Sequence, residues 1–373
     1  MPIATQAPLQ NQEKAKHRGA IVSPIVDFLL FGGLSFIVLF IHFYSGWDQA
    51  WADYQFGWGA FYLAFLINHP HFMHSYQLFY AGFLDKIAEG SAVKKFRFIL
   101  SGFVVPIVLL LWLFWGMQNA SVHTLGLMVN MMFFLVGWHY FKQGYGIMIV
   151  LAGRQKQFLS EMTKKIALIN GYAVWLMTWV HINLTEYTNQ YYGIPYSTFG
   201  LPDALGYGTK ALAVVTTLLF VAMVVRHYHK YKDVPVNALV AYVSALYLWL
   251  GFWRLDTAAF VLIPALHSLQ YIPFCWKITS EKEKLEKPQA PKSKNIVIRH
   301  PRVMQFAAVG VVTGALFFYG LPYLTDKWGV YDQSVLGSQF GFFAFLIFIN
   351  LHHYFLDYAL WRKDNKDMGL LFR

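Results

Sequence analysis

Seven histidines fall inside strongly apolar stretches of this chain, which has 14 His among 373 residues. An ionisable side chain within a membrane span must be buried against a partner or a cavity, so it marks a functional site by default. Neutral imidazole is also a common ligand of iron, zinc and copper in proteins. The candidate metal ligands are His69, His71, His74, His139, His267, His352 and His353.

Several of these histidines have a polar residue one helical turn away. Tyr271 follows His267 by four residues, and Asp357 follows His353 at the same spacing. Residues four apart share a helix face, so these groups can orient an imidazole or complete the coordination shell of a metal ion. We expect orienting or proton-transfer roles for Asp357, Tyr140, Tyr271 and Lys142.

Lys142 lies three residues after His139 in an apolar run. A lysine in lipid is costly unless its side chain faces the protein interior and pairs with an anion. The expected partner is Asp357 or an anion on the substrate. The chain has one cysteine, Cys275, so a metal ion would have to be held by His, carboxylate, amide or Tyr groups.

The string H-x-H-x-x-H at His69, His71 and His74, together with the His352–His353 pair, resembles in kind the histidine boxes of membrane oxygenases. These include fatty-acid desaturases and hydroxylases and a carotenoid-cleaving group. The resemblance implies a non-haem iron enzyme that acts on an apolar lipid or isoprenoid. The desaturases carry repeated HxxHH boxes at cytoplasmic helix extensions, whereas this chain has no HxxHH and its histidines lie within apolar runs.

The elements that carry these residues are predicted to be membrane helices. The chain is 57% hydrophobic and only 13% charged, and its mean hydropathy is +0.40, which is typical of an integral membrane protein. Runs of about 20 apolar residues can cross the bilayer as helices. The sequence therefore predicts an all-α bundle of about ten transmembrane helices, near 22–44, 57–82, 97–117, 122–150, 166–185, 210–227, 235–253, 257–276, 303–324 and 336–361.

Lys and Arg concentrate in every second loop, and the positive-inside rule assigns those loops and both termini to the cytoplasm. If the protein is bacterial, the membrane is the cytoplasmic (inner) one. We expect a cytoplasmic tail over residues 1–21 and a single membrane domain over 22–373 that contains a mobile basic loop at 277–302. The net charge of +11 sits in short loops, so no nucleic-acid partner is expected.

In this topology the seven histidines lie on the second, fourth, eighth and tenth spans, roughly 15–25 Å above the cytoplasmic ends of those helices. A shared depth permits a shared site. The leading hypothesis is a membrane metalloenzyme, a non-haem iron oxygenase, hydroxylase or desaturase that takes an apolar small molecule from the membrane lipids. Iron is favoured, and copper or zinc could replace it.

No glycine-rich nucleotide loop opens a helix, so electrons would come from a separate donor. Two alternatives use the same histidines. One is a haem-binding electron-transfer protein, and the other is a proton-coupled transporter.

Overall fold

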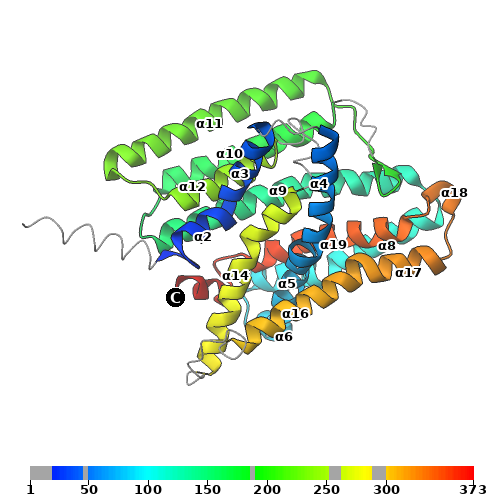
Figure 1. Cartoon of the computed structure of the whole chain (residues 1–373). Helices are drawn as coiled ribbons and strands as arrows, with labels where there is room; N and C mark the ends of the chain where they lie inside the picture. Colours follow the sequence, from blue (N-terminus) through cyan, green and yellow to red (C-terminus); the bar gives the residue numbers. More distant parts are fainter. Residues whose placement is uncertain (1–18, 45–48, 185–189, 252–261, 288–299) are drawn as a thin grey trace, which may run out of the picture.

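Helices form nearly all of the chain in the computed structural model, which describes residues 19–44, 49–184, 190–251, 262–287 and 300–373 (Figure 1). The elements, in chain order, are α2 (Pro24–Phe28), η1 (Leu29–Gly33), α3 (Leu34–Tyr44), α4 (Gln49–Leu63), η2 (Ala64–Asn68), α5 (His69–Tyr80), α6 (Phe83–Ala88), α7 (Ala92–Ile99), η3 (Leu100–Val104), α8 (Val105–Gln118), α9 (Val122–Arg154), α10 (Glu161–Ile182), β1 (Gln190–Tyr191), β2 (Ile194–Pro195), α11 (Asp203–Tyr231), α12 (Val236–Val243), η4 (Ser244–Leu248), α14 (Ile263–Glu286), α16 (Pro301–Ala315), η6 (Leu316–Gly320), α17 (Leu321–Trp328), α18 (Gln333–Leu336), α19 (Phe340–Leu360) and η7 (Lys366–Phe372).

Among the described residues, six helical segments are long and apolar enough to cross a membrane: Pro24–Ile41, Ala92–Gln118, Val122–Arg154, Asp203–Tyr231, Pro301–Trp328 and Phe340–Leu360. They support the prediction of an all-α, multi-pass membrane protein. The other four expected spans are also largely helical where the structure describes them, and one of them contains the shorter apolar helix Val236–Leu248. The count of ten spans, the cytoplasmic termini and the inner membrane stay predictions.

The outer surface of the bundle is apolar. Helix α11 runs along one edge of the molecule in Figure 1, and its outward side chains Val214, Leu218 and Val221 are 58%, 64% and 51% exposed. Such a continuous exposed apolar face is rare on proteins in water. It matches a surface that contacts lipid tails.

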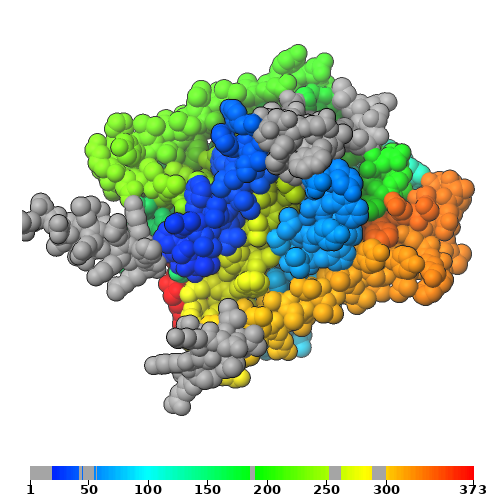
Figure 2. Space-filling model, viewed as in Figure 1, coloured from blue at the N-terminus to red at the C-terminus, as the bar shows by residue number. Residues whose placement is uncertain are grey.

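Four helices meet inside the bundle. Helix α5 packs against α14, α16 and α19, and α9 packs against α10, α12 and α19. In Figure 2, α14 is visible between α2–α3 on one side and α4 on the other. Helices α5, α9, α14 and α19 carry the histidines discussed below.

A distorted turn near the start of the chain is fitted closely to its neighbours. Gly32 has a φ of +145°, and a Cβ atom there would lie 2.2 Å from the Oγ of Ser244. The Nε2 of Gln270 donates to the carbonyl oxygen of Phe31 at 2.6 Å and to that of Ala241 at 3.2 Å. The side chain of Gln270 therefore joins the irregular turn to α14, one turn below His267.

The end of α5 is held by a lysine outside the membrane spans. The Nζ of Lys86 donates to the carbonyl oxygens of Leu78 and Phe79, at 2.5 and 3.2 Å. These carbonyls lie in the last turn of α5, where they lack partners within the helix. Burial lowers the pKa of Lys86 to about 8.

Helix α14 is longer than the sequence predicts. It continues to Glu286, into the segment 277–302 that we expected to be a mobile loop. Lys277 and Lys284 both pair with Glu281, at 2.7 and 2.8 Å, and such pairs three or four residues apart favour helix. Residues 288–299 of that loop, and residues 1–18 of the expected tail, lie outside the described residues.

Arg154, at the end of α9, binds both ends of the described chain. Its guanidinium donates to the carbonyl oxygens of Gly19 and Ala20, at 3.0 and 2.9 Å, and to that of Leu371. Residues 19–20 therefore lie beside Leu371.

Replacing Gly32 by alanine should destabilise the protein by about 1–3 kcal/mol, because the added methyl group overlaps Ser244 and strains a left-handed backbone. The thermal midpoint in detergent, followed by size-exclusion chromatography, should fall by several degrees. Gly208→Ala is the matched control, since a Cβ there meets nothing within 4 Å. Equal midpoints for the two variants would show that the turn is not tightly packed.

Candidate metal centre

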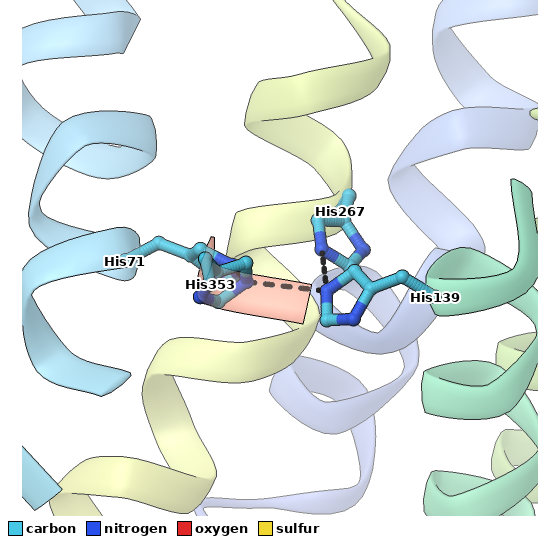
Figure 3. A group of neighbouring side chains, drawn as sticks. All are labelled: His71, His139, His267 and His353. Carbon is cyan, nitrogen blue, oxygen red and sulfur yellow. Dashed lines mark hydrogen bonds between the residues drawn. The ribbon is translucent and has the colours of Figure 1, made fainter. Parts of the chain in front are cut away.

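Four imidazoles from four different helices point at one another inside the bundle (Figure 3). They belong to His71 on α5, His139 on α9, His267 on α14 and His353 on α19. One ligand atom from each lies within 4.8 Å of all the others, and the residues are at most 4% exposed. This group is compatible with a metal site.

The short contacts between the inner nitrogens are too many to be hydrogen bonds alone. The Nε2 of His353 lies 2.9 Å from that of His71 and 3.3 Å from that of His139. The Nε2 of His139 lies 3.1 Å from that of His267. A neutral imidazole nitrogen has one hydrogen or one lone pair, so four such nitrogens form at most two good hydrogen bonds. A shared cation would satisfy all of them.

The same distances suit coordination of one ion. Nitrogens about 2.1 Å from a metal lie roughly 3 Å apart when their bonds meet at a right angle. Adjacent rings in the order His71, His353, His139, His267 have centroids 4.7, 4.8, 4.9 and 4.9 Å apart around the cycle, whereas His71 and His139 are 6.4 Å apart. A regular tetrahedron would make these separations equal, so the set is flattened.

A second polar layer lies one helical turn below the histidines. Ser75 follows His71 by four residues, as Tyr271 follows His267 and Asp357 follows His353. The Oγ of Ser75 lies 2.5 Å from the hydroxyl oxygen of Tyr271. Ser75 and Tyr271 both donate to Oδ1 of Asp357 at 2.9 Å. The carboxylate is therefore fixed through one of its two oxygens.

The other oxygen of Asp357 faces the histidines. Oδ2 lies 3.6 Å from Nε2 of His353 and 3.8 Å from Nε2 of His139. It is buried and has no hydrogen-bond partner among the described residues. Leaving a buried carboxylate oxygen unpaired is costly, and a cation among the imidazoles would remove that cost.

Packing orients the rings. The outer nitrogens of His71, His267 and His353 have no hydrogen-bond partner in the described part of the chain. The His71 ring instead lies 4.3 Å from that of Tyr271, and the His267 ring lies 4.3 Å from that of Tyr140, between ring centroids. Tyr140 and Tyr271, both expected near the chemistry, thus contact the candidate ligands directly.

The other three candidate ligands lie outside the group. His352 is bonded through Nδ1 to the hydroxyl of Tyr76 at 2.8 Å and through Nε2 to the carbonyl oxygen of Ser101 at 2.9 Å. His74 stacks on Phe306 and His69 stacks on Phe318, each with ring centroids 4.4 Å apart. These three histidines contact other parts of the bundle and are not among the four that converge.

Lys142 is near the centre but not bonded to it. Its Nζ lies over the rings of Tyr145 and Tyr172, 5.5 and 5.8 Å from their centroids. No ion pair joins it to Asp357 within the described residues, so the structure does not bring together the pair that the sequence suggested. Conversely, the sequence reasoning missed Ser75, although its spacing from His71 repeats that of the other pairs.

Two cavities reach the centre from different sides. The larger, of about 570 Å³, is bordered by His267 and His353 and has mostly aromatic and aliphatic walls. The smaller, of about 410 Å³, is bordered by His139 and Asp357. A ligand can therefore approach the histidines from either cavity.

Comparisons with protein-family models, with curated proteins and with solved structures gave no significant match for this chain.

Removing one inner imidazole should remove the metal. We expect His353→Gln to weaken binding of a divalent transition metal by roughly 100-fold or more, because it deletes one of four ligands. The matched control is His352→Gln, which alters the neighbouring buried histidine that is bonded to Tyr76 and Ser101. Mass-spectrometric metal analysis of the folded proteins measures the difference. Equal metal content in the two variants would contradict the four-histidine site.

Proposed function

We propose that this chain is a membrane metalloenzyme, a non-haem iron oxygenase, hydroxylase or desaturase that acts on an apolar lipid or isoprenoid. The observation that carries the proposal is the convergence of one ligand nitrogen from each of four buried histidines within 4.8 Å. A redox-active ion held there would activate dioxygen for attack on a C–H or C=C bond.

A catalytic role is favoured over a structural one because an ion held by the four imidazoles would lie beside open cavities. Structural zinc sites are closed tetrahedra, whereas catalytic sites keep a position for water or substrate. Here two cavities border the ligands, one at His267 and His353 and the other at His139. Both give access to the ion.

Contacts between the rings favour a bare ion over haem. Axial haem ligands are separated by the iron and the plane of the macrocycle, yet the rings of His71 and His353 have centroids only 4.7 Å apart and their Nε2 atoms lie 2.9 Å apart. No space for a porphyrin remains between them. We therefore expect no Soret band from the purified protein.

The donor set favours iron among the transition metals. Imidazole suits iron, copper and zinc, and a carboxylate beside open positions is typical of non-haem iron sites that use dioxygen. Asp357 supplies that carboxylate, with Oδ2 3.6 Å from Nε2 of His353. Its role is to bind or orient the ion from below, while Ser75 and Tyr271 fix its direction.

The larger cavity suggests the class of substrate. Phe72, Tyr140, Trp249 and Phe318 are among its aromatic walls, and a volume of about 570 Å³ is in the usual range for a small-molecule site. Such walls bind apolar chains and exclude water from the reacting atoms. Hydroxylation or desaturation would also require a separate electron donor.

Binding of nitric oxide tests the open coordination position without knowledge of the substrate. The iron(II)-loaded protein should take up nitric oxide and give the high-spin ferrous-nitrosyl signal in electron paramagnetic resonance. Asp357→Asn should change that signal and weaken iron binding about 10–100-fold, since it removes the carboxylate charge. A haem-type nitrosyl signal, or an iron-loaded protein that binds no nitric oxide, would refute the proposed centre.

Filling the larger cavity should block turnover but spare the metal. Val136→Trp places an indole in this cavity, and we expect at least a tenfold loss of oxidised lipid products, with iron content unchanged. Membranes supplied with iron, dioxygen and a chemical reductant would be analysed by lipid mass spectrometry. Val214→Trp, on the exposed face of α11, is the control. Undiminished product formation in Val136→Trp would exclude this cavity as the substrate site.

A further inference from the structure

The smaller cavity carries an excess of positive charge. Lys142, Arg362 and Lys363 line it, and Asp357 is the one carboxylate in its wall among the described residues. Asp357 does not neutralise them, because Oδ1 accepts from Ser75 and Tyr271 while Oδ2 faces the histidines.

None of the three cations has an acidic partner in the described part of the chain. Lys142 contacts only aromatic faces, those of Tyr145 and Tyr172. The guanidinium of Arg362 lies over the ring of Tyr358, 4.5 Å from its centroid, and donates to the Tyr358 carbonyl oxygen at 3.2 Å. The charges of Lys142 and Arg362 repel each other. An anion in the cavity would relieve this repulsion.

The rest of the cavity wall is apolar. Trp138, Ile147, Phe274, Trp361 and Leu371 contribute to it. An inorganic anion would leave this surface without a partner, whereas a molecule with an anionic head and an apolar tail would use both kinds of wall. The volume of about 410 Å³ lies within the range for one small molecule and favours a single chain over a whole two-chain lipid.

We propose that this cavity binds a single-chain amphiphilic carboxylate, whose head lies between Lys142 and Arg362 and whose tail packs against Trp138 and Trp361. The site is separate from the aromatic cavity assigned to the substrate. It does not depend on the metal chemistry, so it can be tested on protein without metal.

A brominated long-chain fatty acid is a suitable probe, because bromine quenches the fluorescence of tryptophans that it contacts. Titration into protein held in zwitterionic lipid nanodiscs should quench saturably, and Trp138→Phe and Trp361→Phe should each remove part of the quenching. The methyl ester of the same acid should bind at least about tenfold more weakly, since it cannot form charge-assisted hydrogen bonds. Equal binding of acid and ester would overturn the proposal.

Variants that remove the positive charges test whether Lys142 and Arg362 bind the carboxylate head group. Lys142→Met combined with Arg362→Gln should weaken binding of the acid about tenfold or more, while Lys142→Arg should retain it. The control is Lys210→Met on α11, which does not line the cavity. Size-exclusion chromatography identifies any variant that fails to fold, and Lys142→Arg keeps the test decisive in that case. Unchanged affinity in the folded double variant would overturn the proposal.

A competition experiment distinguishes a free fatty acid from a membrane phospholipid as the source of the anionic head group. Unlabelled fatty acid should displace the brominated probe at concentrations near its own dissociation constant. Nanodiscs that contain anionic phosphatidylglycerol should leave the affinity for the probe within about twofold of its value in zwitterionic lipid. Displacement by the phospholipid and not by the acid would identify a lipid headgroup as the ligand and contradict the single-chain proposal.

Discussion

Four imidazole nitrogens lie within 4.8 Å of one another in an apolar bundle, and one shared positive charge would satisfy all of them. Hydrogen bonds can satisfy only part of the group, because each neutral nitrogen has one hydrogen or one lone pair. The unpaired oxygen of Asp357 faces the same point. A cation there would turn a set of costly buried groups into a stable centre.

The same four-residue spacing recurs on three of the helices that form the centre. His71, His267 and His353 each have a polar residue four positions later, so their helices place two polar layers at matching heights. The lower layer joins Ser75 and Tyr271 to Asp357 through two hydrogen bonds of 2.9 Å. These bonds fix the rotation of α5, α14 and α19 relative to one another, and thereby the direction of the imidazoles above them.

Sequence alone was sufficient to predict an all-α, multi-pass membrane protein and to include the four converging histidines among its seven candidates, because hydropathy and the placement of histidines in apolar runs can be read from it. It could not separate His353 from His352, since adjacent residues share a depth and differ only in helix rotation, which depends on packing against Tyr76 and Ser101. The extension of α14 to Glu286 was also missed. Its alternating Lys and Glu residues are equally consistent with a solvated loop until their pairs are seen.

The order of the four histidines along the chain has a consequence for how the centre would assemble. His71 on α5 comes first and His353 on α19 comes last. Because helices are made in chain order, α5, α9 and α14 would be present before α19 can join them. An ion could meet all four imidazoles only after α19 has packed against α5 and α9, so a chain cut before α19 would offer an incomplete set of ligands.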